Sequence, residues 1–423
     1  MILYFIFLFL VPFQENPKFG VQLFHIGSFP ITPIKLLGIP LLAAALLLPR
    51  PRDAAPQPSA TIFLLFAAFG LYQIIGTTLF SSVFPGGDAS TLFPLVILVL
   101  TTNLLISTQS RMRMTIRVIV LVETFASLWL YKQYYILHYP RPLGPSSDPN
   151  YEALSLVMTV ALAIWMVGYE ETGLWKWAGW ICTPILTFAV FLSQSRGGVV
   201  ALMVMAILAW VNSRQKMLLL LGFAAAAAFM LAIGPSKTIE RFRQIRVEGQ
   251  AQSGAEVSTR DRFELLRAGI HMMEVHPLFG VGLGQFQSVE FHYNPALDAE
   301  VKPHIAHNTY VQLGAEGGIP TLALYLVILG VTLSSCRISQ KLPGVPEDIS
   351  ALALSFQIGL AGIMMAQFFL SAQYVKEVWI FISLAPNLYT ISFQAAAMRR
   401  KSVSAVQIEP VKPIVLRPRL RTE

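Results

Sequence analysis

Apolar runs of membrane-helix length recur along the chain and are separated by short polar segments. A helix needs about 20 mostly apolar residues to cross the hydrocarbon core of a bilayer, and by that measure we expect about twelve membrane helices. The pattern therefore predicts an all-α polytopic membrane protein. The expected spans are 1–13, 33–49, 61–80, 91–107, 115–137, 153–168, 174–193, 197–211, 217–234, 319–336, 350–371 and 377–395.

Two segments near the start differ from this pattern. Phe19–Pro33 alternates with a period of about two residues and contains Pro30 and Pro33, so we expect it to lie at the outer interface or to re-enter without crossing. The first run, 1–13, lacks a basic n-region and a small-residue cleavage site. We therefore expect a retained helix and no cleaved signal peptide.

The composition strengthens the membrane assignment. Of the 423 residues, 55% are hydrophobic and 13% are charged, whereas soluble domains carry about 25% charged residues. The net charge of +8 does not indicate a nucleic-acid partner, because cytoplasmic loops of membrane proteins are basic in any case. Both cysteines, Cys182 and Cys336, fall in or at the end of apolar runs, which predicts buried thiols and no disulfide framework.

The basic residues of the short loops predict the orientation, because cytoplasmic loops carry an excess of Lys and Arg. They concentrate in alternate loops and in the C-terminal tail, which predicts that both termini are cytoplasmic. The long loop is then external, and its charges are exempt from the rule. The basic set in the loops consists of Arg50, Arg52, Arg111, Arg113, Lys176, Arg214, Lys216, Arg337 and Lys341.

Four regions follow from this topology. Residues 1–234 form the N-terminal membrane helices, and 235–306 form one large external loop. Residues 307–398 contain a short external helix and the last membrane helices. Residues 399–423 form a basic cytoplasmic tail that we expect to be disordered.

The large loop contains one clear helix signal. Ser258 followed by Asp261 resembles a capping box for a helix through about Val275. On that helix Arg260, Glu264, Arg267 and His271 share one face, while Arg262 and Leu266 lie on a neighbouring face. The glycines of the following segment, His276–Gly284, permit tight turns and close backbone approach. No preceding strand supports a nucleotide fold.

A polar stretch, His307–Thr321, follows the loop. His307 and Asn308 begin a short helix that is broken at Gly317–Gly318 and Pro320, because glycine lacks a Cβ and proline lacks a donor N–H. We expect a polar group held at the mouth of a membrane helix, with Glu316 bracing the break.

Several arginines have two readings. Arg196 follows Ser195 and opens an apolar helix. It either snorkels to lipid headgroups or, with the helix N-terminus, binds a pyrophosphate. Arg260, Arg262 and Arg267 form either a solvated helix face or a site for a lipid-linked pyrophosphate, for which the forked guanidinium is suited.

His307 also has two readings. It is either an interfacial histidine hydrogen-bonded to backbone or a general base that accepts a hydroxyl proton, with Asn308 orienting it or the acceptor. His304 is a nearby competitor for that role. No His, Cys or carboxylate spacing indicates a metal, so we predict none. Glu123 lies within a predicted membrane helix, either as a packing residue or in a function.

These residues resemble the O-antigen ligase and polymerase superfamily of bacterial envelope glycosyltransferases. The family's His-Asn and downstream Gly-x-x-Thr appear as His307-Asn308 and Gly318 to Thr321. Its Arg-x-x-x-Leu in the large loop appears at Arg262, and its arginine at a helix mouth appears as Ser195-Arg196-Gly197. The resemblance is best over about 190–325, where His276–Gly284 also fits.

The resemblance implies a substrate and a reaction. The donor would be a glycan on undecaprenyl pyrophosphate, and the acceptor would be lipid A–core or a growing glycan. Transfer would be inverting, independent of metal and cofactor, and located at the periplasmic face of the inner membrane. Arg196 and Arg262 would hold the pyrophosphate and His307 would activate the acceptor hydroxyl, with Ser195, Asn308 and Gly318 supporting them.

Alternatives remain within and outside this class. We favour lipopolysaccharide ligation slightly over polymerisation of O-antigen or exopolysaccharide repeat units, and both over protein O-glycosylation. The alternative outside the class is a flippase for lipid-linked oligosaccharide. A flippase needs a polar path through the membrane, and Glu123 is the main charged candidate for one.

Overall fold

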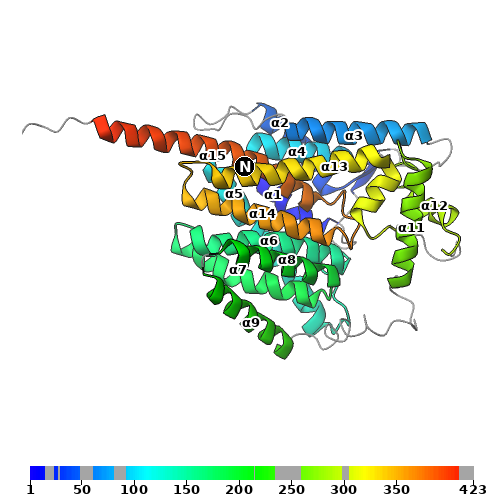
Figure 1. The fold of residues 1–423 in the computed structure, drawn as a ribbon, viewed down its shortest axis with the longest axis horizontal. Helices are drawn as coiled ribbons and strands as arrows, with labels where there is room; N and C mark the ends of the chain where they lie inside the picture. Colours follow the sequence, from blue (N-terminus) through cyan, green and yellow to red (C-terminus); the bar gives the residue numbers. More distant parts are fainter. Residues whose placement is uncertain are drawn as a thin grey trace, which may run out of the picture.

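The computed structural model describes residues 1–14, 23–26, 29–47, 61–80, 92–213, 215–233, 259–297 and 304–408. Most helices run roughly along one long axis, and α11 crosses that direction at one end (Figure 1). The predicted all-α class is confirmed. The helices are α1 Ile2–Leu10, α2 Pro33–Leu47, α3 Thr61–Phe80, α4 Leu92–Leu105, α5 Gln109–Tyr131, α6 Pro149–Tyr169, α7 Gly173–Leu192, α8 Arg196–Asn212, α9 Lys216–Ile233, α11 Thr259–Val275, α12 Phe286–Tyr293, α13 Thr309–Lys341, α14 Glu347–Ala366 and α15 Lys376–Ile408.

Each predicted apolar run falls on a helix. Within the described residues, seven helices are long and apolar enough to cross a membrane, namely α3, α5, α6, α7, α13, α14 and α15. Several other predicted spans, including those in α1, α2 and α8, fall on shorter apolar helices. The length and composition of these helices indicate an integral membrane protein. The count of about twelve crossings stays a prediction.

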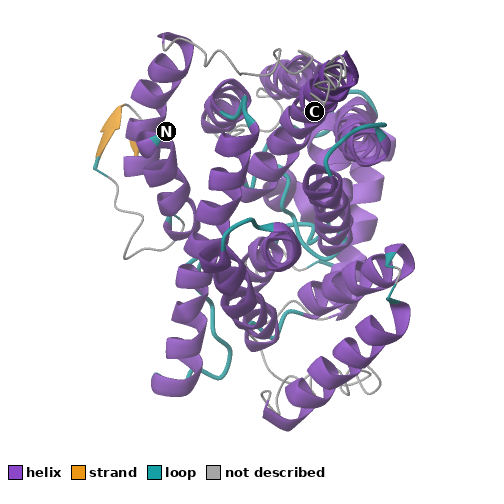
Figure 2. Cartoon of the chain, turned by 90° about the vertical axis from the view of Figure 1, so that its left-hand side faces the viewer, coloured by secondary structure: helices purple, strands orange, loops and turns teal. Residues whose placement is uncertain are grey.

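The alternating segment near the N-terminus forms a short hairpin at the edge of the bundle (Figure 2). Strand β1 (Phe24–Ile26) pairs antiparallel with β2 (Phe29–Ile31), with Phe24 opposite Ile31. The two-residue period therefore reflects strand structure. Its position relative to the membrane stays a prediction.

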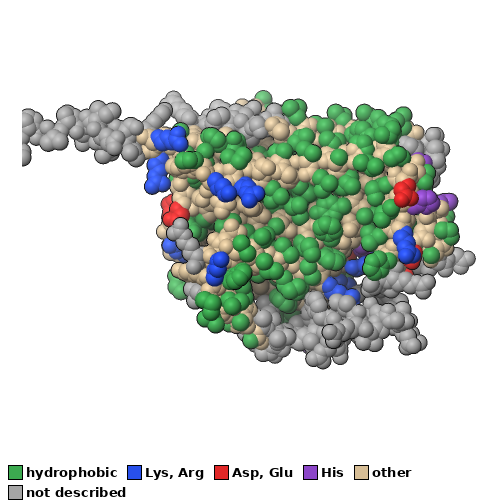
Figure 3. All heavy atoms as spheres, viewed as in Figure 1, with side chains coloured by type: hydrophobic (Ala, Val, Ile, Leu, Met, Phe, Trp, Pro, Cys, Tyr) green, Lys and Arg blue, Asp and Glu red, His purple; other side chains and the backbone are tan. Residues whose placement is uncertain are grey.

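Helix α6 lies at the centre of the bundle and α7 at its surface. In the apolar 18-residue stretch of α6, 78% of the residues are buried inside the structure, against 28% in the corresponding stretch of α7. The outward face of α7 presents Leu174, Trp177 and Ile181. Apolar side chains cover the middle of the molecule, and charged ones gather towards its two ends (Figure 3). An exposed apolar belt of this kind fits a lipid environment.

The loops predicted to be external meet at one end of the bundle. Gln194 donates to the Pro140 carbonyl (2.8 Å), and Thr309 donates to the Leu370 carbonyl (2.6 Å). Tyr72, near the end of α3, donates to the Leu278 carbonyl (2.7 Å). Loops that the charge pattern assigned to one side are therefore adjacent, although which compartment they face stays a prediction.

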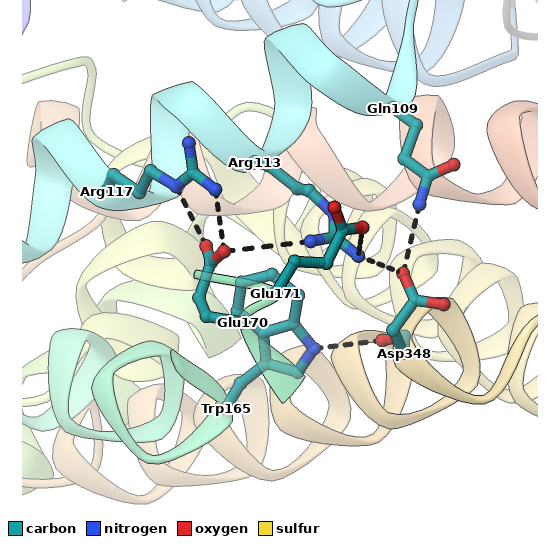
Figure 4. Close-up of polar contacts among 7 residues, drawn as sticks. All are labelled: Gln109, Arg113, Arg117, Trp165, Glu170, Glu171 and Asp348. Carbon is teal, nitrogen blue, oxygen red and sulfur yellow. Dashed lines mark hydrogen bonds and ion pairs between the residues drawn. The ribbon is translucent and has the colours of Figure 1, made fainter. Parts of the chain in front are cut away.

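The opposite end is held by a buried ionic cluster around Arg113 (Figure 4). Arg113 Nη2 lies 2.6 Å from Asp348 Oδ2 on α14, and Arg117 donates twice to Glu170, at 2.9 and 2.6 Å. Glu171 also pairs with Arg113, at 3.1 Å. The sequence predicts Arg113 in a loop, but α5 begins at Gln109, with Thr108 as its N-cap. That assignment is wrong because distant acids neutralise the arginine within the helix.

We expect Glu170→Gln to lower the stability of the protein by about 3–5 kcal/mol, because a buried arginine pair loses its shared carboxylate. The Glu170 side chain is fully buried (0% exposed), whereas that of the neighbouring Glu171 is 76% exposed. Glu171→Gln is thus a matched control, with an expected cost of less than about 1 kcal/mol. The measurement is the midpoint of thermal unfolding in detergent. Equal midpoints for the two variants would contradict a structural role for the cluster.

The C-terminal helix extends further than expected. Helix α15 continues to Ile408 and projects beyond the bundle (Figure 1). The tail expected to be disordered from Arg399 is therefore helical over 399–408. Residues 409–423 lie outside the described part of the chain.

Candidate active site at the broken helix

Helix α13 is broken where the sequence predicts. Gly318 has φ 76° and ψ 175°, a conformation that is open essentially to glycine alone. The break separates a short first part beginning at Thr309 from the long apolar part that ends at Lys341. The first part therefore presents its N-terminus at the end of the bundle where the external loops meet.

The segment His276–Gln285 fills the break. Its backbone N–H groups at Val281 and Gly282 donate to the carbonyls of Ala315 and Glu316, each at 2.9 Å, and the Pro277 carbonyl accepts from Ile319 N–H at 2.8 Å. A kink frees backbone groups that must find partners away from water. This segment supplies those partners, so its donors serve the helix and not a phosphate.

Close backbone approach explains a glycine in the filling segment. Gly280 has φ 63°, and a Cβ there would overlap the Ala315 carbonyl. The predicted role of the glycines in close approach is confirmed at this position. Helix α3 holds the segment from the other side, where Thr77 accepts from Leu283 N–H (3.0 Å).

Glu316 braces the break, as expected. Its Oε1 accepts from Gln312 Nε2 at 2.9 Å, and the backbone N–H groups of Gly284 and Phe286 also donate to its carboxylate. Gln312 in turn accepts from Ala306 N–H at 3.4 Å. The buried glutamate therefore connects α13, the filling segment and the residues that precede His307.

Asn308 is the N-cap of α13. Its side-chain oxygen accepts from the N–H groups of Tyr310 (3.0 Å) and Val311 (3.1 Å), and its amide donates to the Phe368 carbonyl (3.2 Å). These bonds fix the backbone next to His307, which lies at φ 49°. Asn308 thus orients His307 through the main chain, and none of these bonds reaches the imidazole.

The His307 imidazole is half-buried at the start of α13. Its Nδ1 is buried and has no hydrogen-bond partner among the described residues. The pKa of His307 is lowered to about 4, mainly by burial and also by the charges of the Arg262 guanidinium and His304. The ring is therefore unprotonated near neutral pH and keeps a lone pair for an incoming proton.

Helix α11 turns Arg262 towards His307. The predicted helix is confirmed at Thr259–Val275, although Ser258 lies outside the described residues. Gly269 on the same helix packs so closely on Val311 of α13 that a Cβ would overlap it. Because Arg262 lies seven residues before Gly269, it occupies the same side of α11, in electrostatic range of His307.

The neighbouring arginines of α11 are placed differently. Arg267 is exposed and pairs with Glu264 at 3.0 Å, and Glu264 also accepts from Asn294 at 2.9 Å. The Arg260 side chain lies outside the described part of the chain. The two predicted faces of the helix are therefore distinct, and pyrophosphate contact by Arg260 and Arg267 stays a prediction.

Arg196 opens α8 at the same end of the bundle. Its N-cap Ser195 accepts from Gly198 N–H (3.2 Å) and donates to Asn150 Oδ1 (2.9 Å). Gly197 abuts Phe369, where a Cβ would crowd the ring. The Arg196 and His307 segments thus border the same loop between α14 and α15, because the adjacent Phe368 carbonyl holds Asn308.

Sequence reasoning missed Glu290 on α12. Glu290 is 5% exposed, and its Oε1 accepts from His304 N–H at 2.9 Å. Burial raises the pKa of its carboxyl to about 7. The signal was available: a single acid on a short helix one turn after the apolar Phe286, and such a position is buried when that face packs.

Among the described residues, the structure assigns neither a metal site nor a chemical role for Glu123. Among the described residues no three His, Cys, Asp or Glu side chains are grouped as ligands for a metal, and metal independence stays a prediction. Glu123 is buried in α5 and lines a small cavity of about 30 Å³ with Glu377. That cavity lies within the bundle and is lined mainly by apolar residues.

The comparisons with known proteins agree with the resemblance. Residues 181–326 match the family described as O-antigen ligase, and this match supports the resemblance to the O-antigen ligase and polymerase superfamily. The segment contains Arg196, Arg262, His307 and the break at Gly318, as well as Glu290. No curated protein matches the chain significantly.

Proposed function

We propose, from the match of residues 181–326 to the O-antigen ligase family, that the protein is a membrane glycosyltransferase. It moves a glycan from undecaprenyl pyrophosphate to an acceptor hydroxyl at the periplasmic face of the bacterial inner membrane. We favour lipid A–core as the acceptor, with a growing glycan as the alternative. The observation that carries this proposal is the buried His307 Nδ1 at the start of α13, which has no hydrogen-bond partner among the described residues and lies in electrostatic range of Arg262.

The reaction is a single displacement at the anomeric carbon. The acceptor oxygen forms the new bond to that carbon as its proton passes to His307. The bond from the carbon to the pyrophosphate oxygen breaks, and its electron pair leaves with the lipid pyrophosphate. Attack opposite the leaving group inverts the anomeric configuration, and a pyrophosphate leaves readily when its developing charge is stabilised.

The arginines supply that stabilisation in the proposal. Arg262 adds positive charge beside the base, and Arg196 adds it at a helix N-terminus, where free N–H groups favour an anion. A guanidinium presents two parallel donors to two phosphate oxygens. The same positive charge helps to keep the resting His307 unprotonated, so a lone pair is available when the acceptor binds.

We expect Arg262→Lys and Arg196→Lys each to slow transfer about tenfold or more, because one charge-assisted hydrogen bond contributes about 1.5–3 kcal/mol. Lysine keeps the charge but loses the fork. The measurement is the initial rate at which purified protein in lipid nanodiscs consumes a lipid-linked glycan donor. Arg337→Lys is the control, because Arg337 is exposed near the other end of α13. Wild-type rates for both site variants would favour snorkelling arginines instead.

The glycan profile of a deletion strain distinguishes the two acceptors. Loss of all long chains from lipid A–core, with polymer still accumulating on the lipid carrier, identifies a ligase. Single repeat units on lipid A–core identify a polymerase. Loss of long chains from lipid A–core, with the donor retained on the inner face of the membrane, would support the flippase alternative.

A further inference from the structure

The loop between α14 and α15, residues 367–375, is hydrogen-bonded to Thr309, the first residue of α13. The Thr309 N–H donates to the Gln367 carbonyl at 2.9 Å. Its hydroxyl donates to the Leu370 carbonyl at 2.6 Å and accepts from the Ala372 N–H at 2.8 Å. Thr309 is 0% exposed, so these bonds are made away from water and fix the loop on the start of α13.

The position of Thr309 in its helix leaves its hydroxyl available to the loop. A threonine inside a helix often donates to the carbonyl four residues earlier. Thr332 of the same helix does so, at 2.7 Å from the Ile328 carbonyl. No helical turn precedes Thr309, and its hydroxyl combines one donor with acceptor lone pairs. It therefore satisfies a carbonyl and an N–H of the loop at once.

Phe369 connects the same loop with α8. A Cβ built on Gly197 would lie 2.9 Å from the Phe369 Cβ, so the absence of a side chain there permits this close approach. Gly197 directly follows Arg196, and Thr309 lies two residues after His307. The loop therefore contacts the chain both next to the proposed base and next to the arginine at the mouth of α8.

The first turn of α6 holds the loop and the start of α8 together. The Tyr151 hydroxyl donates to the Ser371 carbonyl at 2.8 Å. The preceding residue, Asn150, accepts from the hydroxyl of Ser195, the N-cap of α8, at 2.9 Å. A shift of the loop is therefore expected to reach the N-terminus of α8 through two routes, Phe369 and α6.

We propose that the loop between α14 and α15 sets the position of His307 relative to Arg196, with Thr309 as the positioning residue. The effect on rate rests on the proposed glycosyl transfer, whereas the connection is a property of the fold. In that reaction the base and the arginine act on the two bonds of one anomeric carbon, and a misplacement of about 1 Å can cost about a hundredfold in rate. Thr309 acts through the loop and not on the substrate.

The test compares threonine variants of α13. Thr309→Val keeps the branched shape and the backbone bond but removes both hydroxyl bonds, whereas Thr309→Ser keeps the hydroxyl. Thr332→Val is the matched control, because Thr332 is also 0% exposed and its hydroxyl donates within the helix. Tyr151→Phe releases the loop from α6 and serves as the second test variant if Thr309→Val does not fold. Midpoints of thermal unfolding establish that each variant is folded.

The first measurement is amide hydrogen exchange of the purified proteins in lipid nanodiscs. Thr309→Val is expected to exchange at least about tenfold faster at the Ala372 N–H, which loses its partner. It should also exchange faster at Gly198 and Val199, whose N–H groups bond to Ser195. Thr309→Ser and Thr332→Val should exchange as the wild type does at all these positions.

The second measurement is the rate of donor consumption. In Thr309→Val we expect kcat to fall at least about tenfold while KM for the lipid-linked donor changes less than about twofold, because the lost alignment matters in the transition state. Thr309→Ser should restore kcat to within about threefold of the wild type. Tyr151→Phe should lower kcat in the same way.

Three outcomes would overturn the inference. Unchanged exchange at Gly198 and Val199 in Thr309→Val would show that the loop does not connect the two segments. An equal loss of kcat in Thr332→Val would indicate a general loss of stability instead of positioning. If His307→Asn abolishes transfer while Thr309→Val transfers at the wild-type rate, the proposed function stands without the positioning role. If the wild type does not consume donor, the proposed function fails, and the exchange at the start of α8 still decides whether the loop connects the segments.

Discussion

Replacing His307 by alanine is expected to slow glycan transfer at least about a hundredfold, because a positioned base contributes about 10²–10⁴ to the rate. The Nδ1 atom of His307 is buried and has no hydrogen-bond partner among the described residues. The charge of Arg262 acts on the imidazole. Membrane levels of the variant should stay normal. The measurement is consumption of a lipid-linked glycan donor by purified protein at pH 8.

Because the backbone of His307 has a positive φ, a second variant is needed beside His307→Ala. Its φ of 49° lies in the left-handed region, where alanine is strained by about 1–2 kcal/mol. Asparagine tolerates this conformation and is no base, so His307→Asn tests the chemistry with little backbone cost. His292→Asn, exposed on α12, is the control. If both His307 variants transferred glycan at the wild-type rate, His304 would become the leading candidate for the base.

Local patterns predicted most of the helices. Each predicted apolar run falls on a helix, although α5 begins before its predicted start and α15 continues well beyond its predicted end. The glycines of His307–Thr321 predicted the break at Gly318. The spacing of Arg260, Arg262 and Arg267 predicted that Arg262 lies on a different face of α11. These signals are local, because helix geometry and backbone freedom depend on neighbours along the chain.

Pairings between distant segments could not be predicted in the same way. The local sequence predicts that Arg113 is a basic residue of a loop. Its partner Asp348 lies 235 positions away in sequence and contacts it only in the folded protein. The sequence of His276–Gln285 likewise gives no indication that this segment fills the break in α13. That role depends on backbone carbonyls of α13, which carry no residue signature.

The candidate site also contains some residues that local patterns predict and others that only the fold identifies. His307, Arg262 and Arg196 could be chosen from motif and position, and all three lie at one end of the bundle. Glu290 was missed because an isolated acid on a short helix has no motif. Its meaning comes from burial and from its contact with His304. Asn308 was chosen to orient His307 or the acceptor, which stays a prediction. In the structure it caps the helix and holds a neighbouring loop.

The other large effect is expected from Gly318→Ala, which should abolish transfer and lower stability by at least about 1–3 kcal/mol. Gly318 lies at φ 76°, and a Cβ there would overlap the carbonyls of Leu278 and Pro277. Those atoms are backbone and cannot rotate away. The filling segment must therefore separate from α13, which leaves buried backbone groups unpaired at a cost of about 1–3 kcal/mol each.

Gly330→Ala is the control in the same helix, because nothing lies within 4 Å of a Cβ built there. Since alanine is the better helix former by about 1 kcal/mol, this variant should be as stable as the wild type or more so. The measurements are the midpoint of thermal unfolding and the rate of donor consumption. A Gly318→Ala protein that transfers at the wild-type rate would show that His307 does not depend on the segment packed in the break. The base would then be positioned by the Asn308 cap and the loop between α14 and α15 alone.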